Sequence, residues 1–390
     1  MELIKSFSKK ISKKKVIFAS LLILFILVIC LISIEFFSIL LIKKLGYNWE
    51  PAYLRIIKGY KPSNLYGGRT EYHSWGQWGV PNYQGRIRNN CLDINYVFNS
   101  YGARDKERSL SGKDRTLVFG DSFIEGFGVS QDKTLPAYLE KISGKEFLNL
   151  GVSGGYGVLN EYILYRDFAK KFEHESVIVG LTIGNDFTDN DPLSWLGNAK
   201  LHYFPFWKLS DDKRDLEIVY FAPKVDGKFV PELDPKNKVS NYKFYSSWKD
   251  FSAFMRISEF IRDRKVYFDK DSPFLKRTNY NLEFSDDQVT ATLIAYDKFS
   301  KLIGNKRKYV AVLPSIPDIH YYLNNGRQKA PKFEEFKDEL TSQGWQVIDT
   351  INAFANISTD DISKYYIVCD GHPSAEGHEL FAKYIYKFIK

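Results

Sequence analysis

Four short segments of this chain combine residue types that acyl-transfer chemistry requires. Gly120-Asp121-Ser122-Phe123 carries a serine, Asn149 to Gly155 a glycine-rich turn, Gly184-Asn185-Asp186 a side-chain amide, and Asp370-Gly371-His372-Pro373 a histidine beside an acid. A serine hydroxyl becomes a nucleophile when a histidine accepts its proton, and an acid orients that histidine. Backbone N–H groups and an amide can hold the oxyanion that forms. The segments therefore predict acyl transfer if the fold brings them together.

The elements around these segments favour such a meeting. Short apolar runs alternate with amphipathic stretches, a pattern typical of a parallel sheet covered by helices on both faces. The predicted strands are 116–119, 146–152, 176–183, 308–314 and 345–351, and the predicted helices are near 134–142, 157–173, 288–303, 331–342 and 374–389. Three of the four segments follow predicted strands, and ligands of parallel sheets gather at the carboxyl ends of strands.

The four segments resemble the blocks of the SGNH (GDSL-type) hydrolase family. They read GDSF, NLGVSGG, GND and DGHP in family order, across about residues 115–390. The resemblance implies a flavodoxin-like three-layer α/β fold with a parallel sheet. It also implies Ser122 as nucleophile, His372 as base, and an oxyanion hole made by Gly154, the Asn185 amide and the Ser122 N–H.

Two further features bear on this resemblance. The family has two residues between the last Asp and His, and this chain has only Gly371, so Asp370 is a weaker candidate for the orienting acid than His372 is for the base. The segment NSYGARD (99–105) resembles membrane-anchored members of the family, and no chemical role is carried over from it.

Alternative interpretations exist for each group. Ser122 alone could cap a helix, and Asn185 and Asp186 could be turn residues. Gly151 to Gly155 also reads G-x-S-x-G, the nucleophile elbow of α/β-hydrolases, which would make Ser153 the nucleophile. That fold requires several strands before the elbow, whereas only one clear strand of this domain precedes it.

The remaining acids and histidines suggest no cofactor. Asp186, Asp189 and Asp191 lack the glycine and distal glutamate of a calcium loop and are expected in a solvated turn. His378 is expected on a helix surface. The other four histidines have no ligand spacing, so we expect neither a metal nor a cofactor.

Composition excludes several classes of protein. Six lysines and one glutamate precede Val16, so this tail carries most of the net charge of +8. A nucleic-acid-binding protein would need that charge spread over a folded face. Three cysteines without a C-x-x-C pair exclude a disulfide scaffold, although Cys91 and Cys369 could pair in an oxidising compartment.

The N-terminal region predicts a membrane anchor. Residues 16–34 carry no charge, and about 1.5 Å per residue lets them span the hydrocarbon core. The alternative is a cleaved signal peptide, but the run is longer than the apolar core of such a peptide. Preceding lysines place the N-terminus in the cytoplasm and the remainder outside. The predicted organisation is a basic tail (1–15), an anchor (16–42), a leader (45–114) and a hydrolase-like domain (115–390) with an inserted lid or substrate-binding subdomain (192–282).

Three functions remain open at this point. The first is an outward-facing serine esterase, anchored in the cell membrane, that removes small acyl groups, acetyl being favoured, from a glycan. The second is an O-acyltransferase in which a sugar hydroxyl replaces water in the same site. The third is a catalytically silent scaffold that binds glycan or protein. Aromatic residues interleaved with charges in the insertion (207–224) favour an acylated carbohydrate over a lipid as substrate. The sequence makes no prediction about oligomeric state.

Overall fold

The computed structural model describes most of the chain in two compact units. The described residues are 13–44, 70–88, 92–194, 205–223, 229–231, 252–257, 261, 284–326, 330–367 and 370–390. One unit comprises Met1–Lys61 with Phe244–Arg262, and the other Pro62–Lys243 with Asp263–Lys390. Cys91, Cys369 and the first twelve residues lie outside the described residues, and so does the proposed disulfide.

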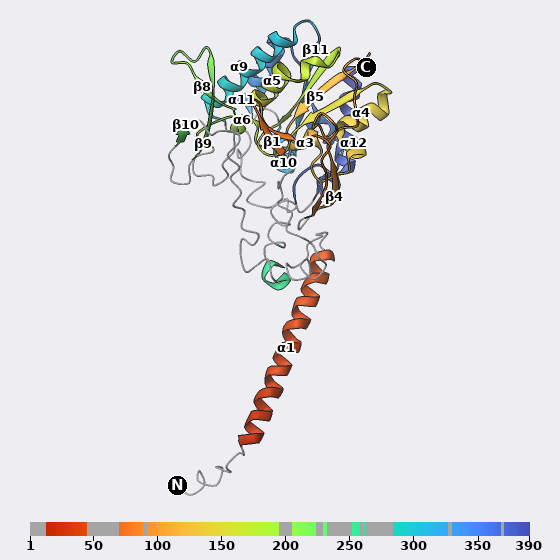
Figure 1. The fold of residues 1–390 in the computed structure, drawn as a ribbon, viewed down its shortest axis with the longest axis vertical. Coiled ribbons are helices and arrows are strands. Elements are labelled where there is room, and N and C mark those ends of the chain that lie inside the picture. The colour runs from red at the N-terminus through yellow and green to blue at the C-terminus, as the bar shows by residue number, and fades with distance from the viewer. Residues whose placement is uncertain are drawn as a thin grey trace. The chain divides into compact units, whose positions relative to one another are not determined.

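The first unit contains the long helix α1 (Lys13–Lys44) (Figure 1). Its stretch Lys14–Lys44 is long and apolar enough to cross a bilayer, a property that a signal sequence near the N-terminus shares. Glu35 follows the uncharged run. Its Oε1 accepts a hydrogen bond from the Ala253 N–H at 2.6 Å, and its Oε2 accepts one from the Ser252 hydroxyl at 2.8 Å. The one carboxylate in this stretch therefore has hydrogen-bond donors.

The second unit is built on a five-stranded parallel sheet. Its strands are β5 (Thr116–Gly120), β6 (Phe147–Gly151), β7 (Ser176–Thr182), β11 (Arg307–Leu313) and β12 (Gln346–Asp349). They lie in the order β12-β11-β7-β5-β6, and every neighbouring pair is parallel. In chain order this is 2-1-3-4-5, the flavodoxin-like arrangement, so the predicted fold class is confirmed.

Helices cover both faces of this sheet (Figure 1). The helices are α3 (Ser122–Glu125), α4 (Leu135–Ser143), α5 (Val158–Asp167), α6 (Asp186–Asp189), α9 (Asp286–Ile303), α10 (Ile316–Asn325), α11 (Pro331–Ser342) and α12 (Ala375–Ile389). Leu117 and Phe119 pack in one cluster with α5, α9 and α11, whereas Val118 packs in another with α4, α10 and α12. Strands buried on both faces explain the continuous apolar runs of the sequence.

The segment before the sheet shares its core. It forms two antiparallel pairs, β1 (Thr70–His73) with β2 (Gly76–Gly79), and β3 (Gln84–Arg88) with β4 (Asp93–Val97). Trp75 and Trp78 are buried in the cluster of the α5 face. The Trp78 indole also donates a hydrogen bond to the Tyr101 carbonyl at 2.7 Å. Aromatic residues of the predicted leader are thus core residues of this unit.

Part of the predicted insertion is a small antiparallel sheet. Its strands are β8 (Pro205–Leu209), β9 (Leu216–Pro223) and β10 (Phe229–Pro231), in the order β10-β9-β8. Phe206 is buried in the same cluster as Phe119, while Lys208 and Glu217 are exposed. Much of the remaining insertion lies outside the described residues.

Candidate active site

Three of the predicted site residues form one hydrogen-bonded chain. Nε2 of His372 lies 2.8 Å from Oγ of Ser122, and Nδ1 of His372 lies 2.5 Å from Oδ2 of Asp370. All three side chains are partly exposed, so a substrate can reach them. With Nδ1–H donating to Asp370, Nε2 is left to accept the Ser122 proton. This arrangement can generate an alkoxide-like nucleophile.

The turn after β5 presents Ser122. Asp121 is the N-cap of α3, and its Oδ1 accepts a hydrogen bond from the Phe123 N–H at 2.8 Å. Ser122 is therefore the first helical residue and not the cap, contrary to the alternative that the sequence left open. Its hydroxyl is free of the capping role and meets His372 instead.

The turn before α12 compensates for the short spacing between Asp370 and His372. Gly371 has φ +87°, a left-handed conformation that glycine adopts without steric cost. The N–H groups of Asp370 and Gly371 both donate to the Ile367 carbonyl, at 2.9 and 2.7 Å, and the Ile367 N–H donates back to the His372 carbonyl at 2.7 Å. These hydrogen bonds bring the carboxylate of Asp370 to the imidazole of His372, although only Gly371 separates the two residues.

Two phenylalanine rings pack beside the imidazole of His372. The ring centroids of Phe127 and Phe123 lie 4.9 and 5.5 Å from that of His372. Both phenylalanines are almost fully buried, so they restrict rotation of the imidazole away from Ser122.

The glycine turn of the second segment lies against the turn that carries Ser122. The Val152 N–H donates to the Gly120 carbonyl at 3.0 Å, and the Ser153 N–H donates to Oε2 of Glu125 at 3.1 Å. Gly154 follows with φ +113°, where a side chain would be strained. Ser153 itself is buried, and its hydroxyl has no partner among the described residues. His372 thus bonds Ser122, the residue of the first segment, and not Ser153.

Asn185 lies beside the same turn, but its amide is engaged. Nδ2 of Asn185 donates to Oδ2 of Asp189 at 2.6 Å and to Oδ2 of Asp121 at 3.2 Å. These two bonds use both hydrogens of the amide group. Donation to an oxyanion therefore requires release of one of them, and the longer bond to Asp121 costs less to break.

The two acids that bond this amide belong to a group of four buried acids. Asp121, Glu161, Asp186 and Asp189 are each at most 6% exposed. Burial and mutual repulsion raise the pKa values of Glu161 and Asp186 well above their usual range. Burial first and the charge of Asp121 second raise the pKa of Asp189 to about 8. The prediction of a solvated turn was wrong for Asp186, Asp189 and Asp191, because all three side chains are buried. No signal in the sequence indicated that Glu161 would join them.

The prediction for His378 was also wrong. This residue lies on the inner side of α12 and is fully buried. Burial, followed by the charges of Arg104 and His372, lowers the pKa of His378 to about 3. His378 therefore stays neutral behind the site. A pattern of one histidine on an amphipathic helix does not reveal which way it faces.

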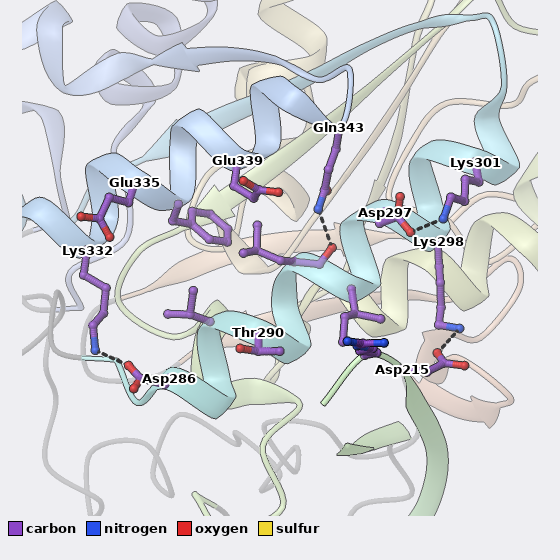
Figure 2. Close-up of a pocket in the computed structure, with 15 residues that line it drawn as sticks. Asp215, Asp286, Thr290, Asp297, Lys298, Lys301, Lys332, Glu335, Glu339 and Gln343 are labelled. Carbon is purple, nitrogen blue, oxygen red and sulfur yellow. Dashed lines mark hydrogen bonds and ion pairs between the residues drawn. The ribbon is translucent and has the colours of Figure 1, made fainter. Parts of the chain in front are cut away.

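One pocket of the described residues does not include the triad. A pocket of about 990 Å³ lies between α9, α11 and the β8–β9 turn, and Figure 2 shows its charged lining, including the pairs Lys332–Asp286 and Lys298–Asp215. None of Ser122, Asp370 and His372 lines it. Among the described residues, no group of three or more His, Cys, Asp or Glu side chains has metal-binding geometry.

Comparison with known proteins gives structural matches only. No family model and no curated protein sequence matches the chain. Solved structures with a similar fold include a lipase/acylhydrolase from Enterococcus faecalis (11% identity, 71% of this chain and 95% of that chain, TM-score 0.36) and a member of the lipolytic protein G-D-S-L family from Veillonella parvula (11%, 70% and 97%, 0.32). An acetyl-xylooligosaccharide esterase from Geobacillus, crystallised as a mutant, matches at 12% identity over 72% of this chain and 95% of that chain, with a TM-score of 0.33. At this level of similarity, any assignment of chemistry depends on the side chains of this chain.

The raised pKa of Asp189 predicts a pH-dependent stability. The usual pKa of 3.8 applies to the unfolded chain, so folding takes up a proton between that value and about 8. The contribution of Asp189 to the free energy of unfolding is largest below about pH 4 and decreases as the pH rises to about 8. Above about pH 8 it no longer changes with pH. Asp189→Asn resembles the protonated form at every pH. We therefore expect the stability of this variant, relative to wild type, to rise between about pH 5 and pH 8 and then to level off.

The measurement is the thermal unfolding midpoint of both proteins at about pH 5, 7 and 9. Asp212→Asn is the control, since Asp212 is a solvent-exposed carboxyl whose pKa its hydrogen bond to Ser210 lowers. A difference between Asp189→Asn and wild type that does not change with pH would contradict the prediction.

Proposed function

We propose that this chain is a serine esterase of the SGNH type, anchored in the cell membrane and facing outward, that removes small acyl groups, acetyl being favoured, from a glycan. The observation that carries the proposal is the hydrogen-bonded chain Ser122–His372–Asp370, with distances of 2.8 and 2.5 Å. The order of the four segments along the sequence supports it independently.

The reaction has two halves. Ser122 Oγ attacks the ester carbonyl carbon while its proton passes to Nε2 of His372. The oxyanion accepts hydrogen bonds from the N–H groups of Ser122 and Gly154 and from the Asn185 amide once this amide leaves Asp121. When the intermediate collapses, the C–O bond to the sugar breaks and His372 gives the proton to the departing sugar oxygen, which leaves as a hydroxyl. Water then gives a proton to His372 and attacks the acyl-enzyme, and the carboxylic acid leaves as Ser122 regains its proton.

The first prediction from this mechanism concerns the covalent residue. Ser122→Ala should lower kcat by at least about 10⁴-fold, because it removes the hydroxyl that is bonded to His372. Ser153→Ala is the matched control and should retain turnover. A serine-directed phosphonate should add to Ser122, and an adduct mapped by mass spectrometry to Ser153 would disprove the assignment.

Within the triad, Asp370→Asn should cost less activity than His372→Ala. The base is indispensable, whereas asparagine can still contact Nδ1 of His372. The comparison is made on kcat with a chromogenic acetyl ester, and equal losses in the two variants would contradict it.

The proposed topology places the lysine tail in the cytoplasm and the second unit outside. The support is the lysine excess before residues 16–34 and the uncharged length of that run. Protease added to intact spheroplasts that express the full chain should digest residues 62–390 and spare the N-terminal tail. A fully protected chain would contradict the orientation, and release of the second unit from the membrane without protease would contradict an uncleaved anchor.

A carbohydrate-borne ester is the proposed substrate. The described strands β8 and β9 expose Lys208 and Glu217, whereas a lipase lid would be expected to present a continuous apolar face. Some aromatic residues of this segment serve the core, as Phe206 does, and are not available for stacking on sugars. We expect a higher kcat/KM on acetylated oligosaccharides than on p-nitrophenyl acetate, which controls for the acyl group, and a lower value on long-chain p-nitrophenyl esters. A preference for the long-chain ester would refute the carbohydrate substrate.

A further inference from the structure

Glu125, at the end of α3, joins two parts of the proposed site that are separate in the sequence. Its carboxylate is almost fully buried, and one oxygen, Oε2, accepts hydrogen bonds from the Ser153 N–H at 3.1 Å and from the Tyr96 hydroxyl at 2.9 Å. Its backbone N–H donates to the Asp121 carbonyl at 2.9 Å. One residue is therefore bonded both to the turn that presents Ser122 and to the residue before Gly154.

The segment before the sheet holds Glu125 in this place. Arg104, from NSYGARD, is 1% exposed, and its Nη1 donates to the Glu125 carbonyl at 2.9 Å and also contacts the Gly126 carbonyl. Its Nη2 donates to the Val129 carbonyl at 2.5 Å. These carbonyls belong to the last residue of α3 and to residues that follow it, and a cation is favourable at the C-terminal end of a helix.

Tyr96 completes the arrangement from β4. The guanidinium carbon of Arg104 lies 3.9 Å from the centroid of the Tyr96 ring, a cation–π contact. The hydroxyl of the same ring bonds Glu125. Arg104 thus stabilises both the backbone of Glu125 and the ring whose hydroxyl orients its carboxylate.

We propose that Glu125, supported by Tyr96 and Arg104, is a positioning residue that holds the Ser153–Gly154 backbone at the distance from Ser122 that oxyanion binding requires. The role rests on the proposed esterase function. Among the described residues, the carboxylate of Glu125 is hydrogen-bonded to Ser153 and Tyr96 and to no residue of the triad, so it acts through the loop and transfers no proton itself. An oxyanion donor displaced by about 1 Å costs on the order of 10²-fold in rate.

The geometry explains why a buried carboxylate suits this position. The two donors share one oxygen, so the acceptor must take two hydrogen bonds at once, which a carboxylate or an amide oxygen can do. Glu125→Gln preserves such an oxygen, whereas Glu125→Ala leaves the Ser153 N–H and the Tyr96 hydroxyl without it.

The test uses the full-length protein in detergent and two measurements. We expect Glu125→Ala to lower kcat about tenfold or more with little change in KM, Tyr96→Phe to lower it less, and Glu125→Gln to retain most of it. Tyr165→Phe is the matched control, because Tyr165 is a buried tyrosine whose hydroxyl pairs with His174 at 3.1 Å, and it should keep wild-type kcat.

Hydrogen–deuterium exchange of the amides at 152–155 is the second measurement and needs no substrate. It should be faster in Glu125→Ala and Tyr96→Phe than in wild type and in Tyr165→Phe. Unchanged exchange and unchanged kcat in Glu125→Ala would overturn the positioning role, as would a loss of kcat that Glu125→Gln does not rescue. A wild-type protein without ester turnover would overturn the esterase, and the exchange data would then decide the link between Glu125 and the loop by themselves.

Discussion

The proposed site depends on how closely α3 approaches the sheet. Ile124 lies over the ends of neighbouring strands, and a Cβ at Gly180 would lie 2.6 Å from its Cγ1. A Cβ at Gly151 would lie 2.2 Å from the Glu125 N–H nitrogen. Only glycine at these strand positions lets the helix approach the sheet this closely. Because α3 lies so close to the sheet, Ser122 is presented at the carboxyl ends of the strands. For the same reason, Glu125 reaches the loop after β6.

This close contact has an electrostatic cost. Asp121 caps α3 from a buried position, and burial raises its pKa, although the Phe123 N–H, His372, Thr182 and Asn185 favour its charged form. Asp186, Asp189 and Glu161 lie in the same buried environment, and like charges so close cannot all ionise together. This destabilising cluster lies next to the amide that the proposed mechanism uses, and such costs are common at functional sites.

The segment before the sheet also supports the proposed site. Its tryptophans complete the core on the α5 face, and its Tyr96 and Arg104 contact the turn that carries Ser122. A leader that only connected an anchor to an enzyme would need no buried arginine. Burial of a guanidinium is costly unless its donors are bonded. Here Nη1 and Nη2 of Arg104 bond backbone carbonyls and the Tyr96 ring lies against the guanidinium, whereas Nε has no partner among the described residues.

By itself, the sequence determined the parallel sheet, the helices on both faces and the four segments at the ends of elements. The secondary structure could be predicted because apolar runs and turn residues act locally along the chain. The segments could be placed together because the carboxyl ends of parallel strands lie on the same side of the sheet. It did not determine that Asp370 reaches His372 through the left-handed Gly371, nor that Asp189 and His378 are buried. It also gave no sign that Tyr96 bonds Glu125, 29 positions away. Such contacts arise from packing between distant segments, which decides what each polar side chain faces, and only the tertiary structure contains that information.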